Sequence, residues 1–279
     1  PTTAIQALDY FGLLPYTLPE LQSLKGVAQS APHIVDVWEH TLATVRWLYK
    51  ILDVLGPDQT PESVNDLTMG LLILQLGRYR KQLAVHLASP PNINRPMRAL
   101  LTLAALYHDA GKPAARQVEG DRVHFYDHEK HSAALINQRG RELQLSNEEI
   151  DRLEAIILNH MRIHFMANRN TPPTRRTIYR FFRATGTAGV DVCVLTLADL
   201  LATYGPSLQQ DMWNKYLEIC VKLLEAWWEK PEESVAPPPL LSGNDLQTEF
   251  GIPPGPEIGK IKEGLREAQA TGEIITRDD

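Results

Sequence analysis

The chain has 279 residues, of which 43% are hydrophobic, so it can bury a substantial core in one large domain or two small ones. Its net charge of −6 excludes a surface that is basic overall, and contact with nucleic acid must therefore depend on a local patch. No apolar run reaches the ~18 residues of a membrane span, so we expect no membrane segment.

Cysteine usage and the first residues add two expectations. The chain has 2 cysteines without C-x-x-C spacing, which predicts buried thiols in a reducing, cytoplasmic compartment. The sequence starts without an initiator methionine or the basic and apolar regions of a signal peptide. We therefore expect it to be a fragment of a longer chain.

Hydrophobic spacing predicts an almost entirely helical protein. Apolar residues recur at steps of three and four, the amphipathic pattern of α-helices, and strand signals are few. Ser146 followed by Glu149 has the spacing of a capping box, which marks a helix start. The predicted helices are 35–55, 64–88, the segment that ends at His108, 148–161, 174–184, 188–204 and 209–228.

We divide the chain into three parts. Residues 1–24 are a predicted lead-in or linker, and residues 25–230 form the main domain. Residues 231–279 are a proline-rich linker followed by a small helical segment, in which Pro256 is expected to open a helix and Gly272 to end it. The predicted fold class is therefore all-α, a helical bundle with a small helical tail.

The most informative feature is the pair His108-Asp109 at the end of the apolar run 99–107. An imidazole beside a carboxylate in so apolar a segment is explained by a bound cation, whereas a hydrophobic core does not explain it. Asp199 also lies in an apolar helix, where it would either neutralise a cation or pair with an arginine. His40, His128 and His160 complete the set, so the sequence predicts a metal site assembled from several helices.

The predicted donors limit the metal without choosing it. Imidazole nitrogen and carboxylate oxygen together suit Mn, Fe, Co, Ni or Zn, and they suit Mg if water fills the remaining positions.

A basic segment follows the predicted helix 148–161. No acidic residue occurs between Arg169 and Arg183, and aromatic residues are interleaved with the arginines. Arg176, Arg180 and Arg183 share one helix face, which suits contact with RNA or nucleotide phosphate. The alternative is an ordinary helix whose aromatic residues enter the core while its arginines are solvated.

The order of these residues resembles the HD superfamily of metal-dependent phosphohydrolases over residues 33–205. Residues 107–113 and 125–133 are similar to the family's most specific stretches. Other segments are similar to the HD-bearing part of bacterial CCA-adding and poly(A) polymerase-like tRNA nucleotidyltransferases, namely 37–42, 158–161 and 241–246. We find no Gly-Ser or Gly-Gly followed by a D-x-D pair, so we expect no nucleotide addition by this chain.

The resemblance implies which residues bind metal. It makes His40, His108, Asp109 and Asp199 the ligands of one divalent metal. His128 and His160 would face the cleft and bind substrate phosphate or help to hold a second metal.

The chain departs from the family pattern at two positions. Asn159 precedes His160 where the fullest two-metal pattern has adjacent histidines, which weakens the expectation of a second metal. Asp127 replaces a glycine that relatives often have. We interpret His131 and His164 as surface residues and leave them out of the metal shell.

The resemblance also implies a helical HD bundle that hydrolyses a phosphomonoester or phosphodiester of a nucleotide or RNA end by metal-activated water. Asp109 would accept the water's proton, and His128 or His160 would protonate the leaving oxygen. Lys112 would contact a phosphoryl oxygen, or would instead complement a helix dipole.

A second function remains open. The chain could be a tRNA-binding accessory module of a poly(A) polymerase or CCA-adding enzyme, with the HD site structural or vestigial. The expected partners are accordingly a nucleotide or RNA phosphate, tRNA, and a nucleotidyltransferase domain in a longer chain, but no membrane.

Overall fold

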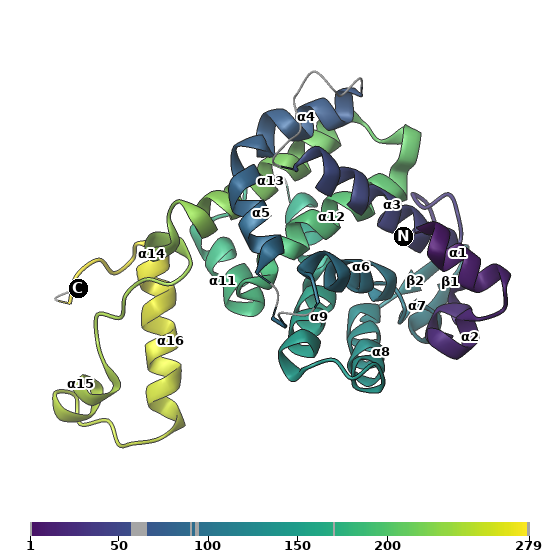
Figure 1. Cartoon of the computed structure of the whole chain (residues 1–279). Coiled ribbons are helices and arrows are strands. Elements are labelled where there is room, and N and C mark those ends of the chain that lie inside the picture. Colours follow the sequence, from purple (N-terminus) through teal and green to yellow (C-terminus); the bar gives the residue numbers. More distant parts are fainter. Residues whose placement is uncertain (1, 57–65, 90, 93–94, 170, 278–279) are drawn as a thin grey trace.

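A computed structural model describes residues 2–56, 66–89, 91–92, 95–169 and 171–277 (Figure 1). The described chain is almost entirely helical, which confirms the predicted fold class. The α-helices are α1 (Thr2–Tyr10), α2 (Leu14–Thr17), α3 (Val37–Val54), α4 (Leu67–Leu76), α5 (Arg80–Ala88), α6 (Met97–Tyr107), α7 (Lys112–Ala115), α8 (His128–Glu142), α9 (Asn147–Asn159), α10 (Met161–Ala167), α11 (Arg175–Thr185), α12 (Ala188–Tyr204), α13 (Gln210–Trp228), α14 (Pro231–Ser234), α15 (Gly243–Thr248) and α16 (Pro256–Thr271). The shorter 3-10 helices are η1 (Pro19–Leu24), η3 (Gly77–Tyr79) and η4 (Gly205–Ser207).

Helix α12 is the centre of the bundle. Every residue from Ala188 to Thr203 is buried, because α3, α9 and α13 pack around the helix. The segment Ala188–Ser207 is long and apolar enough to cross a membrane by length and composition, but 89% of the apolar 18-residue window within it is buried inside the fold. Its apolar character is therefore that of a core helix, and its Asp199 is placed deep in the bundle.

The strongest sequence patterns predict their helices to within a few residues. The segments 174–184, 188–204 and 209–228 correspond to α11, α12 and α13. The capping box also forms: Glu149 N donates to Ser146 Oγ at 3.3 Å, and Ser146 N donates to Glu149 Oε2 at 2.8 Å. These reciprocal bonds satisfy backbone donors at the start of α9.

One predicted helix is interrupted, and one element was not predicted. The segment expected at 64–88 is divided by η3 into α4 and α5, where Gly77 lowers the helix propensity. Its predicted start at Val64 lies outside the described residues. The strands β1 (Arg116–Glu119) and β2 (Arg122–Phe125) form an antiparallel hairpin. All of β1 is exposed, so it lacks the alternation that reveals a half-buried strand.

The described part of the predicted lead-in is folded onto the bundle. It forms α1, α2 and η1, and Leu14, Leu21 and Leu24 are fully buried. Glu20 on η1 accepts hydrogen bonds from Arg139 of α8 and from the hydroxyl of Tyr107 on α6. Burial alone would raise the pKa of Glu20, but these hydrogen bonds hold it below its usual range.

Replacing Glu20 tests whether this segment stabilises the domain. We expect Glu20→Ala to lower the free energy of unfolding by about 2 kcal/mol, because it leaves the buried Arg139 with Glu142 as its remaining carboxylate partner and removes the acceptor of the Tyr107 hydroxyl. Urea denaturation followed by circular dichroism measures the change. Glu218→Ala, at an exposed position on α13, is the matched control, and an equal effect of the two variants would contradict the expectation.

The C-terminal segment projects from one side of the bundle, next to α11 and α14 (Figure 1). Helix α16 begins at Pro256, ends before Gly272 in the left-handed region, and packs against α11. Both predicted boundaries are therefore confirmed. The prolines between α14 and α15 connect this helix to the bundle.

Candidate metal centre

Separate elements bring the predicted site residues to one point. His40 comes from the middle of α3, and His108 and Asp109 follow α6. His128 is the first residue of α8, His160 separates α9 from α10, and Asp199 lies on α12. All of these side chains are buried.

Asp109 lies between two groups of potential ligands. His40, His108 and Asp199 form one group, and His128 and His160 form the other group together with Asp109 itself; within each group the ligand atoms lie within 4.8 Å of one another. Asp109 Oδ2 is 3.4 Å from His40 Nε2 and 3.2 Å from His108 Nε2. Its other oxygen, Oδ1, is 3.2 Å from His128 Nε2. One carboxylate thus faces both groups.

Hydrogen bonds aim the histidine lone pairs at this centre. The Nδ1 atoms of His108, His128 and His160 lie 2.7–2.8 Å from backbone carbonyl oxygens. Since a carbonyl can only accept, each Nδ1 carries the proton and each Nε2 is left to act as a ligand in the neutral ring. This orientation is the one that metal-binding histidines adopt.

The buried Nε2 atoms fit a cation better than they fit each other. His40 Nε2 and His108 Nε2 form no hydrogen bond within the described chain, although His40 Nε2 lies 2.9 Å from Asp199 Oδ1. His128 Nε2 and His160 Nε2 are 3.2 Å apart, so two lone pairs would face each other. Orphaned nitrogens beside two carboxylates are explained by a divalent metal ion, which they would bind.

Electrostatics favour positive charge at the centre. Burial alone would raise the pKa of Asp109, but His108 and Lys112 hold it well below its usual range. The nearby imidazoles of His108, His164 and His40 do the same for the pKa of Asp199 against the effect of burial. Burial would lower the pKa of His108, yet the two carboxylates raise it to about 10. Both carboxylates are therefore ionised at neutral pH and attract a cation.

Lys112 is already engaged by a carboxylate. It is buried, and its Nζ lies 2.7 Å from Asp109 Oδ2 and donates to Gln29 Oε1 at 2.7 Å. The ammonium lines the same cleft as the carboxylates. Contact with a phosphoryl oxygen stays a prediction.

The sequence analysis missed two histidines at the centre. His164, which we interpreted as a surface residue, has Nε2 2.9 Å from Asp199 Oδ2 and Nδ1 2.9 Å from the hydroxyl of Tyr216. Its position one turn after His160 was the available signal, because residues four apart share a helix face. His33, in the loop before α3, lies edge-on to His40 with ring centroids 4.9 Å apart.

His164 fixes the orientation of the carboxylate of Asp199, which is one of the predicted metal ligands. We expect His164→Asn to weaken metal binding by about 10-fold to 100-fold, because Asp199 loses the partner of its Oδ2 oxygen. Titration with Mn²⁺ or Ni²⁺ in a calorimeter measures the affinity. His131→Asn is the matched control because His131 is exposed on α8, and equal affinities in both variants would contradict a positioning role.

The arginines of α11 are not among the described residues that line the metal cleft. Arg176 pairs with Glu273 at 2.7 Å, Arg180 with Glu267 at 2.7 Å, and Arg183 with Glu263 at 2.7 Å. These glutamates belong to α16 and the turn after it, so the cationic face is partly covered by the C-terminal segment. The predicted role of these arginines in substrate binding remains a prediction.

Asp127 has a backbone conformation that favours glycine. Asp127 immediately precedes α8 with φ of 57°, in the left-handed region that glycine adopts without a steric penalty. This turn places His128 at the first position of its helix. Aspartate is one of the residues that tolerate this conformation, so the turn is preserved.

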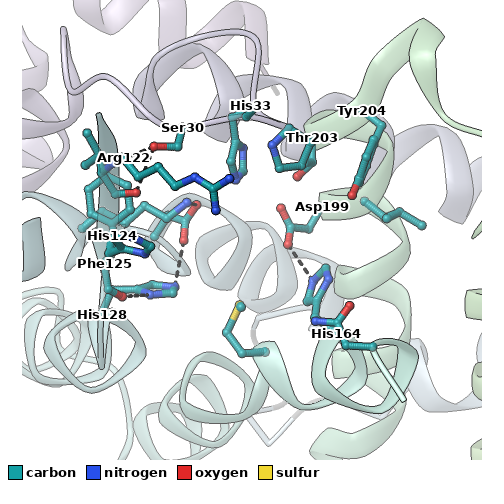
Figure 2. A pocket seen from close by; sticks show the side chains of 18 of the residues that line it. Ser30, His33, Arg122, His124, Phe125, His128, His164, Asp199, Thr203 and Tyr204 are labelled. Atoms are coloured by element: carbon teal, nitrogen blue, oxygen red, sulfur yellow. Dashed lines mark hydrogen bonds and ion pairs between the residues drawn. The ribbon is translucent and has the colours of Figure 1, made fainter. Parts of the chain in front are cut away.

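The centre opens into a cleft of about 770 Å³. In Figure 2, Arg122, His124 and Phe125 of the hairpin form one wall, and Asp199, Thr203 and Tyr204 of α12 form the opposite wall. His33 lies over the cleft between them. Ser30 joins its loop to the hairpin, since Ser30 Oγ bonds both the amide and the carbonyl of Val123.

Comparisons with known proteins agree with this geometry. A family model described as HD domain matches residues 37–204. The chain is 30% identical over 274 residues to an A-adding tRNA nucleotidyltransferase of Deinococcus radiodurans, covering 98% of the chain and 51% of the relative. It is 27% identical over 280 residues to a CC-adding tRNA nucleotidyltransferase of Thermus thermophilus, covering 99% and 50%. The chain thus spans about half the length of these curated relatives.

Proposed function

Because the chain belongs to the HD domain family, whose members bind divalent metals, we propose that it is a metal-dependent phosphohydrolase. The proposed substrate is a phosphomonoester or phosphodiester of a nucleotide or RNA end, such as a 2′,3′-cyclic phosphate. The observation that carries this proposal is the pair of ligand groups that face Asp109, with their Nε2 atoms directed inward. The metal identity stays open among Mn, Ni, Co, Fe, Zn and Mg.

Different buried residues would have different roles in the proposed hydrolysis. His40, His108, Asp109 and Asp199 would hold the metal. When bound, a divalent metal acts as a Lewis acid towards the phosphoryl group and lowers the pKa of a coordinated water.

The remaining steps fall to side chains that line the cleft. Asp109 would take the proton of the attacking water, and Lys112 would offset negative charge on a phosphoryl oxygen. Burial, together with His128 and His108, lowers the pKa of His160 to about 3. His160 is thus neutral at ordinary pH. His128 or His160 would protonate the leaving oxygen, and either ring must first gain a proton at Nε2.

The relatives support a second role in the same protein. Both are tRNA nucleotidyltransferases about twice as long as this chain. We propose as the alternative that the chain is a tRNA-binding accessory part of such an enzyme, in a longer protein with a nucleotidyltransferase domain. Its HD site would then be structural or vestigial. The intact buried ligand set argues against a vestigial site, because a site that has lost its metal has no need of inward-facing nitrogens.

Metal analysis and a generic substrate separate these functions. The purified chain is analysed by mass spectrometry for bound metal and then tested for hydrolysis of bis(p-nitrophenyl) phosphate with added Mn²⁺ or Ni²⁺. We expect bound divalent metal and metal-stimulated release of nitrophenol. Binding of tRNA without metal content or hydrolysis would favour the accessory role instead.

Removal of the metal provides a separate prediction. We expect EDTA treatment followed by dialysis to abolish turnover and added Mn²⁺ or Ni²⁺ to restore it, because the proposed water has no other strong activator. We also expect the midpoint of thermal unfolding to fall on chelation, since ligands that bind only the folded state stabilise it. Full activity after chelation would contradict metal-dependent hydrolysis.

A further inference from the structure

A second cavity lies beside the metal cleft, between α10 and α11, with a volume of about 600 Å³. Met161 lines both cavities, so they share part of one wall. Glu129 and Phe165 also line it and directly follow His128 and His164 of the metal centre. A molecule whose end lies in the metal cleft could therefore extend into this second cavity.

Arginines dominate the charged lining of this cavity. The arginines are Arg162, Arg169, Arg176 and Arg180, against the single carboxylate of Glu129. Arginine forms paired hydrogen bonds with phosphate oxygens, which makes such a cluster suitable for phosphate groups. The chain as a whole has a net charge of −6, so the cluster is a local departure from its overall balance.

Two of these arginines are available for a ligand. Arg176 and Arg180 pair with glutamates of the C-terminal segment. Arg162 and Arg169 form no ion pair or side-chain hydrogen bond within the described part of the chain. Arg162 is also half-buried, and an unpaired cation in that position is costly unless an anion binds it.

An exposed aromatic ring completes the cavity. Phe165 lines it and is 59% exposed, although a phenylalanine gains stability from burial. Cationic grooves with exposed aromatic rings bind single-stranded nucleic acid, because the cations contact phosphates while the bases stack on the rings. A mononucleotide in the metal cleft would leave both features unused.

We propose that this arginine cavity binds the nucleotides that precede a reacting RNA end, so that the substrate is a single-stranded oligoribonucleotide. The inference rests on the proposed phosphohydrolase function, since it names the substrate of that site. Arg162 and Arg169 bind backbone phosphate, and Phe165 stacks on a base.

The test compares two substrates with the same reacting group. One is a nucleoside 2′,3′-cyclic phosphate, and the other is an oligoribonucleotide of about six residues that ends in it. We expect the double variant Arg162→Gln/Arg169→Gln to raise KM for the oligonucleotide by about 10-fold and to leave the kinetics of the mononucleotide unchanged. Phe165→Ala, which changes no charge, should raise the same KM selectively. Arg141→Gln on α8 is the matched control at an exposed arginine outside the cavity.

Direct binding separates this inference from the proposed function. If neither substrate is hydrolysed, the proposed function fails, and fluorescence anisotropy with the labelled oligonucleotide decides the cavity's role. We then expect the double variant to weaken binding by about 10-fold and to reduce its dependence on salt. Unchanged binding, or equal changes in KM for both substrates, would overturn the inference.

Discussion

Replacing Asp109 with alanine is expected to abolish both metal content and hydrolysis. Asp109 faces His40 and His108 through Oδ2 and faces His128 through Oδ1, so its loss removes a donor from both ligand groups. We expect bound metal to fall to roughly one tenth of the wild-type amount or less, and turnover of bis(p-nitrophenyl) phosphate to fall by about a thousandfold or more. Mass spectrometry and the phosphodiesterase assay measure the two effects on the same preparation.

The experiment must show that any loss of metal or activity does not result from unfolding of the variant. The alanine variant leaves Lys112 and His108 buried without their carboxylate partner, which itself lowers stability. Asp109→Asn keeps the volume of the side chain, and circular dichroism verifies the fold of both variants. Asp151→Ala on α9 is the control at an exposed aspartate. If a folded Asp109 variant retained full metal content and turnover, the assigned centre would be wrong.

The sequence predicted the donors of the centre because their chemistry conflicts with their surroundings. His108, Asp109 and Asp199 interrupt apolar segments, and a polar residue in an apolar segment can be recognised from the sequence alone. The structure places all three at the centre of the bundle. The cost of burying a polar group is thus the reason that these residues could be predicted.

Other site features depend on distances that the sequence does not contain. His164 was interpreted as a surface residue, yet its Nε2 atom lies 2.9 Å from Asp199 Oδ2 of another helix. His33 lies in a loop, where hydrophobic periodicity gives no information about its direction. The shared wall between the metal cleft and the arginine cavity likewise follows from packing among α8, α10 and α11.

The fold was predictable where helices are long and rich in apolar residues, and less so where elements are short. Helix α12 follows its pattern, whereas the hairpin is exposed along β1 and α7 has only four residues. The basic segment at α11 was ambiguous for another reason. Its aromatic residues enter the core, as expected for an ordinary helix. Arg176 and Arg180 pair with glutamates of the C-terminal segment, which neither interpretation included.

Gly111, between the proposed metal ligand Asp109 and α7, is expected to be indispensable for the local packing. A Cβ atom there would lie 2.3 Å from the carbonyl oxygen of His128 and 2.5 Å from the amide nitrogen of Ser132. Both are backbone atoms of α8, so they cannot move without displacing the helix. The amide of Gly111 also donates to Ser132 Oγ at 2.8 Å, which fixes the same contact.

We therefore expect Gly111→Ala to lower the free energy of unfolding by about 3 kcal/mol, because the added methyl group separates α7 from α8. His128 begins α8, so the shift also displaces it from Asp109, and metal-dependent turnover should fall together with stability. Gly264→Ala is the matched control, since nothing lies within 4 Å of a Cβ there on exposed α16. That substitution should raise stability slightly, by up to about 1 kcal/mol, through helix propensity. Equal stability of the two variants in urea denaturation would show that α8 can be displaced without loss of stability. The close contact between Gly111 and α8 would then not be what positions His128.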